Sequence, residues 1–83
     1  MPKIKIKYRF LGREKSYGLS HNHKNLIEID KRLKGKFRFY VIIHELLHQI
    51  FKEKTESQIL RAEKILVNNL WEQGYRFVDN KIR

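Results

Sequence analysis

Two histidines and a glutamate occur together at His44, Glu45 and His48, in the order His-Glu-x-x-His. On a helix, residues four positions apart share one face, so both imidazoles can reach a single Zn²⁺ ion. The glutamate between them can then act as general base toward water at the metal. The spacing therefore predicts a site for one zinc ion per chain, with Glu45 beside it.

The residues around this motif are apolar. Between Phe39 and Phe51 the only charged side chain apart from the histidines is Glu45. Burying two imidazoles and a carboxylate on one helix without partners carries a large desolvation cost. A bound metal ion removes that cost, and for this reason we interpret the motif as a metal site.

Three strands are expected before the motif. Residues 3–10 alternate lysine or arginine with apolar side chains, which is the period of a strand with one buried face. Residues 15–19 and 26–30 are the other expected strands, with polar loops between them. The side chains of the first strand expected to face the core are Ile4, Ile6, Tyr8 and Phe10.

Two helices are expected to follow. The first carries the motif and is predicted over about residues 37–52. Thr55 is a plausible N-cap for the second, which is predicted over about residues 56–73 and is expected to stop at Gly74. Residues 75–78 are expected as a short strand or an extended tail. The fold class predicted is α+β, with a small antiparallel sheet of about three strands packed on a helical hairpin, in one domain spanning residues 1–83.

A catalytic zinc usually has three protein ligands, so a third ligand is expected. Glu63 lies within the apolar stripe of the second helix, where an unpaired carboxylate is costly. An antiparallel hairpin places Glu63 opposite the histidine pair, and Glu56 about 10 Å further along the axis at 1.5 Å per residue. Glu63 is therefore preferred, while Glu56, His21 and His23 remain open, as does a site with no third ligand.

These residues resemble those of the zincin metallopeptidases, in the gluzincin arrangement. The strand at 26–30 followed by Val-Ile-Ile-His-Glu-Leu-Leu-His is also similar to small phage and bacterial HExxH proteins, and more distantly to SprT-like and ImmA/IrrE-type domains. The resemblance covers about residues 25–72. SprT-like proteins take a third histidine after the motif, and none follows His48 in this chain.

The resemblance implies hydrolysis of a peptide bond in a protein or peptide substrate. It implies that His44, His48 and Glu63 bind zinc and that Glu45 is the catalytic base. It also implies that the substrate lies as an added strand along a sheet edge near the metal. Tyr40, Tyr75 and His23 are open candidates for stabilising the oxyanion.

The net charge is +10 and is concentrated in the first half of the chain. Residues 1–38 carry 12 Lys and Arg against three acids, a balance of +9, and residues 39–83 carry +1. Such asymmetry is typical of proteins that bind nucleic acid or an acidic partner, although lysines on a strand also give solubility and block edge pairing. The candidate binding residues are Lys3, Lys5, Lys7, Arg9, Arg13 and Lys15.

The alternative to a peptidase is a non-catalytic basic protein, stabilised by zinc, that binds nucleic acid or an acidic protein. In an 83-residue chain without cysteine, a metal can supply stability that a small core does not. No secretory signal and no membrane span is evident, so the sequence predicts a cytoplasmic protein without a membrane partner.

Overall fold

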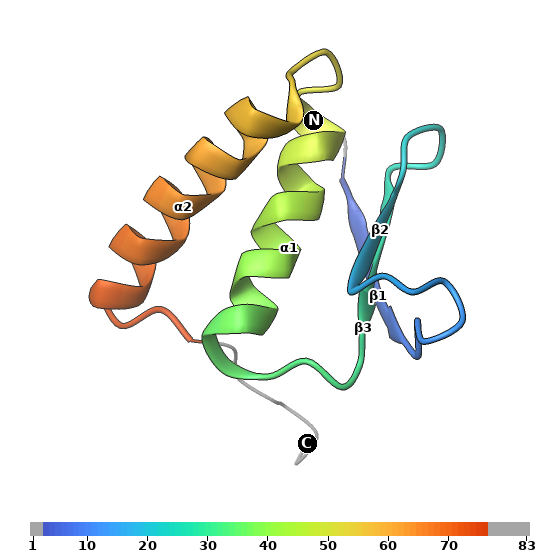
Figure 1. Cartoon of the computed structure of the whole chain (residues 1–83), viewed down its shortest axis with the longest axis horizontal. Coiled ribbons are helices and arrows are strands. Elements are labelled where there is room, and N and C mark those ends of the chain that lie inside the picture. The colour runs from blue at the N-terminus through green and yellow to red at the C-terminus, as the bar shows by residue number, and fades with distance from the viewer. Residues whose placement is uncertain (1–2, 77–83) are drawn as a thin grey trace.

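A three-stranded sheet carries two helices on one side. The computed structural model describes residues 3–76. The strands are β1 (Lys5–Arg9), β2 (Gly18–His21) and β3 (Leu26–Asp30), followed by helices α1 (Gly35–Ile50) and α2 (Glu56–Glu72). In Figure 1, α1 lies between the sheet and α2. The predicted α+β class, with strands preceding a helical hairpin, is confirmed.

The sheet is mixed, whereas the sequence predicted an antiparallel one. Its strand order is β1-β3-β2, so β3 occupies the centre. β2 pairs with β3 in antiparallel register, and β1 pairs with β3 in parallel register. The chain reverses direction twice between β1 and β3, and β3 therefore runs in the direction of β1. Alternation within a strand does not reveal which strand is its neighbour.

The hydrophobic core lies between the sheet and α1. Ile27 and Ile29 of β3 are fully buried and cluster with Leu33 and Val41, and Ile42 is partly buried against them. Gly18 and Ser20 of β2 face the same side, since they pair with Ile29 and Ile27. The residues of β3 between these point to the other side of the sheet.

The apolar face of β1 is less buried than its alternation predicted. Ile4 packs against the core, but Ile6, Tyr8 and Phe10 are 36%, 37% and 49% exposed. The reason is the position of α1, which packs on β2 and β3 and does not extend across β1.

The boundaries of β2 and α1 are shifted from those predicted. β2 spans Gly18–His21 and follows a turn in which Lys15 has a left-handed conformation, with φ of 53°. α1 runs from Gly35 to Ile50, two residues earlier at each end than predicted, and a turn closed by Lys54 N–H donating to the Phe51 carbonyl follows it.

α2 starts at Glu56, as predicted, and ends at Glu72, one residue before the predicted end. Thr55 accepts a hydrogen bond from the Gln58 amide, and the Gln58 side chain accepts from Thr55 N–H, which completes a capping box. Gly74 follows the helix with φ of +90°. Of the extended segment predicted at 75–78, Tyr75 and Arg76 are not in a strand, and residues 77 and 78 lie outside the described part.

The side of the sheet away from the helices holds two buried carboxylates. Glu28 accepts hydrogen bonds from Arg9 and lies 2.7 Å from His21 Nε2. Asp30 accepts from the Arg32 guanidinium and from the Arg32 and Leu11 amides. The bond from Arg9 is the main reason that the pKa of Glu28 falls from 4.5 to about 2. Bonds from Arg32 likewise lower the pKa of Asp30 well below its usual range.

Replacing Glu28→Gln is expected to lower the free energy of unfolding by about 1–3 kcal/mol at pH 7, because Arg9 and His21 lose a charged acceptor. A lowered pKa stabilises the fold fully above pH 4.5, and this contribution is lost as the pH falls toward about 2. Urea unfolding at pH 7 and pH 3 measures the difference, with exposed Glu72→Gln as control. A difference that stays constant across this range contradicts the assignment.

Candidate metal centre and active site

The two motif histidines face each other across one turn of α1. Their Nε2 atoms are 3.1 Å apart, and their rings meet edge to face with centroids separated by 4.6 Å. Both side chains are partly buried, with His44 19% and His48 32% exposed. The predicted juxtaposition of the two imidazoles is therefore present.

Glu56 is the carboxylate that reaches both Nε2 atoms. Its oxygens lie 2.9 Å from His48 Nε2 and 3.5 Å from His44 Nε2. Ligand atoms on tetrahedral zinc, at bonds of about 2.0–2.1 Å, are separated by about 3.3 Å. The separations among His44, His48 and Glu56 lie around this value, so the donor set fits one zinc ion and leaves a fourth position.

Glu63 lies on the other side of the His44 ring. Its Oε1 is 2.7 Å from His44 Nδ1, and the residue is buried. In metal sites a carboxylate in this position fixes the tautomer and orientation of the ligating imidazole. The structure thus brings the predicted third ligand to the site, in contact with the ring nitrogen that points away from His48 and Glu56.

The sequence ranked Glu56 below Glu63 because of its offset along the helix axis, and this offset underestimated how close Glu56 lies to the histidines. His48 lies in the last turn of α1 and Glu56 in the first turn of α2, and a short turn joins them. Glu56 is consequently next to His48, and its side chain extends to His44 as well. An offset along one axis omits both the crossing of the helices and the length of the side chain.

The other two histidines lie elsewhere. His21 contacts Glu28 on the side of the sheet away from the helices. His23 is exposed in the turn between β2 and β3. Neither is grouped with His44 and His48 in the described part of the chain.

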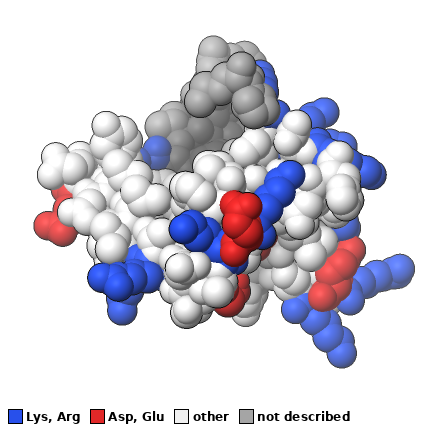
Figure 2. Space-filling model, turned by 90° about the horizontal axis from the view of Figure 1, so that it is seen from above, with Lys and Arg blue, Asp and Glu red and all other residues white. Residues whose placement is uncertain are grey.

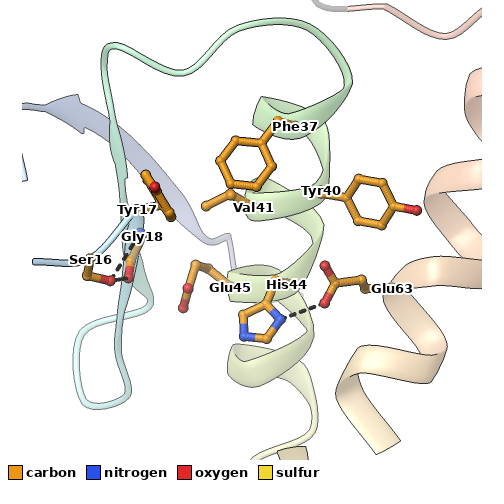
Figure 3. A pocket seen from close by; sticks show the side chains of 9 residues that line it. All are labelled: Ser16, Tyr17, Gly18, Phe37, Tyr40, Val41, His44, Glu45 and Glu63. Atoms are coloured by element: carbon orange, nitrogen blue, oxygen red, sulfur yellow. Dashed lines mark hydrogen bonds and ion pairs between the residues drawn. The ribbon is translucent and has the colours of Figure 1, made fainter. Parts of the chain in front are cut away.

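Glu45 faces the sheet instead of α2. Its side chain extends toward Gly18 on β2, and the residue is 9% exposed (Figure 3). Burial raises its pKa, while the charges of His44 and His48 act in the opposite direction. A raised pKa makes a carboxylate a stronger proton acceptor, which suits a general base.

A cavity of about 410 Å³ opens beside Glu45 between α1 and the start of β2. Tyr17 and Phe37 form one wall, with their rings edge to face at 5.0 Å. Tyr40 also lines the cavity, and its hydroxyl donates to Asn68 Oδ1 at 3.0 Å. The full lining, drawn in Figure 3, is Ser16, Tyr17, Gly18, Phe37, Tyr40, Val41, His44, Glu45 and Glu63.

Gly18 is a site residue that the sequence analysis did not identify. A Cβ atom there would lie 2.8 Å from Val41 Cγ1, 2.9 Å from Glu45 Cγ and 3.0 Å from Glu45 Oε2. Only glycine leaves room for the Glu45 side chain between α1 and β2. The available signal was a glycine inside the strand predicted at residues 15–19, which often marks a close approach of another part of the backbone or a ligand.

Gln49 fixes the end of α1 to the sheet and was also missed. It is 6% exposed, and its Nε2 lies within hydrogen-bonding distance of Ser20 Oγ and of the His21 and Leu26 carbonyls. These contacts hold the helix that carries both histidines against the β2–β3 hairpin. A polar residue directly after His48 in an apolar helix was the signal.

Within residues 3–76, β2 lies at an edge of the sheet, beside the cavity. Asp30 N–H donates to the Tyr17 carbonyl, which fixes the alternation of the antiparallel ladder. By that alternation the backbone groups of Gly18 and Ser20 point away from β3. Ser16 Oγ hydrogen-bonds to both the amide and the carbonyl of Gly18, so that among the described residues of β2 Ser20 is the position open for pairing.

Comparison of the chain with protein-family models, with curated proteins and with solved structures found no match in any of the three. Neither helix in the described part of the chain has the length and apolarity of a membrane-spanning segment.

Proposed function

We propose that the protein is a zinc-dependent hydrolase that cleaves a peptide bond. The observation that carries this proposal is the convergence of the Nε2 atoms of His44 and His48 with the Glu56 carboxylate, next to a buried Glu45 at a cavity. When bound, zinc supplies a Lewis acid and makes water acidic enough to be a nucleophile near neutral pH.

The protein residues supply the proton transfer and the alignment. Glu45 takes a proton from the attacking water and delivers it to the amide nitrogen, as the C–N bond breaks and the carbonyl carbon gains the hydroxyl. Glu63 holds the His44 ring through Nδ1. The open edge of β2 at Ser20 offers backbone groups to an extended peptide, and the aromatic wall of the cavity suits an apolar side chain.

A second candidate is a zinc site that serves only the fold. Within residues 3–76, α2 packs on α1 and not on the sheet. The metal-binding set takes His44 and His48 from α1 and Glu56 from α2, so zinc would join the two helices. This candidate predicts unfolding on chelation without peptide cleavage.

The deciding experiment uses untagged protein, so that no added histidines supply zinc. Elemental analysis is expected to give about one zinc per chain, and His44→Ala is expected to lose it. Incubation with a mixed peptide library, read by mass spectrometry, is expected to show cleavage that stops on chelation and returns with zinc. Stoichiometric zinc without cleavage supports the structural candidate, and no zinc overturns both.

A further inference from the structure

The face of the sheet away from the helices carries a row of lysines. Lys5 and Lys7 pair in register with Leu26 and Glu28, which places them on that face, and Lys3 precedes them by two residues. All three are exposed. We call Lys3, Lys5 and Lys7 the lysine row.

The acids near this row form ion pairs with residues outside it. Glu28 is bound by Arg9 and contacts His21, and Glu14 also pairs with Arg9. Asp30 is paired with Arg32. Two arginines thus engage these three carboxylates, while the lysine row has no ion-pair partner within residues 3–76. Arg9, which the sequence grouped with these lysines, is occupied by the two glutamates.

Two further lysines extend the positive surface at its ends. Lys24 lies near Lys5, because Lys5 N–H donates to the carbonyl of the adjacent Asn25 at 2.9 Å. Lys31 lies at the other end, where its amide donates to the Arg9 carbonyl at 3.0 Å. Figure 2 shows Lys and Arg side chains along its right-hand side, which is the side of the sheet in Figure 1, with Asp or Glu side chains among them.

We propose that the lysine row binds the sugar-phosphate backbone of a nucleic acid strand, without regard to base sequence. Lysines two residues apart on a strand repeat at about 6.6–6.8 Å, and all point to one side. An evenly spaced row of ammonium groups, whose neighbouring carboxylates are paired with other residues, complements a polymer that carries one phosphate per nucleotide. An acidic protein surface generally mixes charges and has no such regular repeat.

This binding is independent of the metal site. α1 covers the face of the sheet that bears Ile27 and Ile29, and the lysine row lies on the opposite face. A nucleic acid on the lysine row therefore leaves His44, His48 and the cavity open. Chelation of zinc under conditions where the protein stays folded is expected to leave the affinity unchanged.

The test measures binding of the full chain to a fluorescently labelled single-stranded DNA of 20 nucleotides, by anisotropy at several salt concentrations. Three lysine contacts give a slope of log K against log[salt] of about −2, at about −0.7 per contact. The double variant Lys5→Glu/Lys7→Glu is expected to weaken binding more than tenfold and to reduce that slope by about 1.4. Arg61→Glu/Lys64→Glu on α2 changes the net charge equally and is the matched control.

Each outcome decides the proposal. A larger loss in the β1 variant than in the α2 control, together with the reduced slope, supports the lysine row as the binding surface. Equal losses show that only the net charge matters and overturn it. Polyglutamate of matched charge that binds as tightly as the DNA would assign the surface to an acidic protein instead. Circular dichroism melting checks that both double variants are folded.

Discussion

Glu45→Gln is expected to abolish peptide cleavage while leaving about one zinc per chain. The substitution keeps the shape of the side chain beside Gly18 but removes the group that accepts the proton. General acid–base catalysis contributes about 10²–10⁴-fold to rate, and kcat/KM is expected to fall by at least that factor. The stability is not expected to fall, because burial disfavours the carboxylate at this position.

The measurement pairs kcat/KM on the best library peptide with zinc content and a melting curve. Glu72→Gln, an exposed carboxylate at the end of α2, is the matched control and is expected to retain full activity. A Glu45→Gln protein that retains kcat/KM within threefold would remove Glu45 from the mechanism. Lost zinc would instead show that Glu45 supports the metal site.

Glu56→Gln and Glu63→Gln are expected to separate a metal ligand from the residue that orients a ligand. Loss of an outer partner of a ligating histidine typically costs 10–100-fold in metal affinity. Glu63 contacts His44 Nδ1, and the loss of zinc affinity in Glu63→Gln is therefore expected to lie in this range. Glu56 contacts both Nε2 atoms, and its replacement is expected to cost more than 100-fold.

Zinc affinity is best measured by competition with a chromophoric chelator at fixed pH. His23→Gln, in the exposed turn, is the control and is expected to bind zinc as the wild type does. The reverse order, with Glu63→Gln losing more affinity than Glu56→Gln, would assign Glu63 as the third ligand, as the sequence favoured. Equal, small losses of zinc affinity in the two variants would show that only the two histidines bind the metal.

Features determined by nearby residues were predictable from the sequence. The capping box at Thr55, the end of α2 before Gly74 and the placement of His44 beside His48 depend on residues within a few positions of each other. The bounds of β3 also depend on nearby residues, and the observed bounds are those predicted. In each case the periodicity or the local hydrogen-bonding chemistry leaves few alternatives.

Features determined by packing between distant segments were not predictable. The parallel pairing of β1 with β3 joins segments that are far apart in the sequence. The exposure of Ile6, Tyr8 and Phe10 depends on where α1 crosses the sheet. The reach of Glu56 depends on the crossing of the two helices. The need for glycine at position 18 arises only when β2 and α1 approach each other. None of these features can be predicted from a pattern of residues that are close together in the sequence.

β1 lies at an edge of the sheet, outside the region that α1 covers. The outer face of β1 and the cavity beside α1 are therefore separate surfaces, and substitutions can change one without the other. Changes at Lys3, Lys5 or Lys7 alter the charge of an outer face without moving a residue that lines the cavity. Changes at the cavity likewise leave that face intact. Substitutions in this one strand can therefore change the charge of the outer face while the residues that line the cavity stay the same.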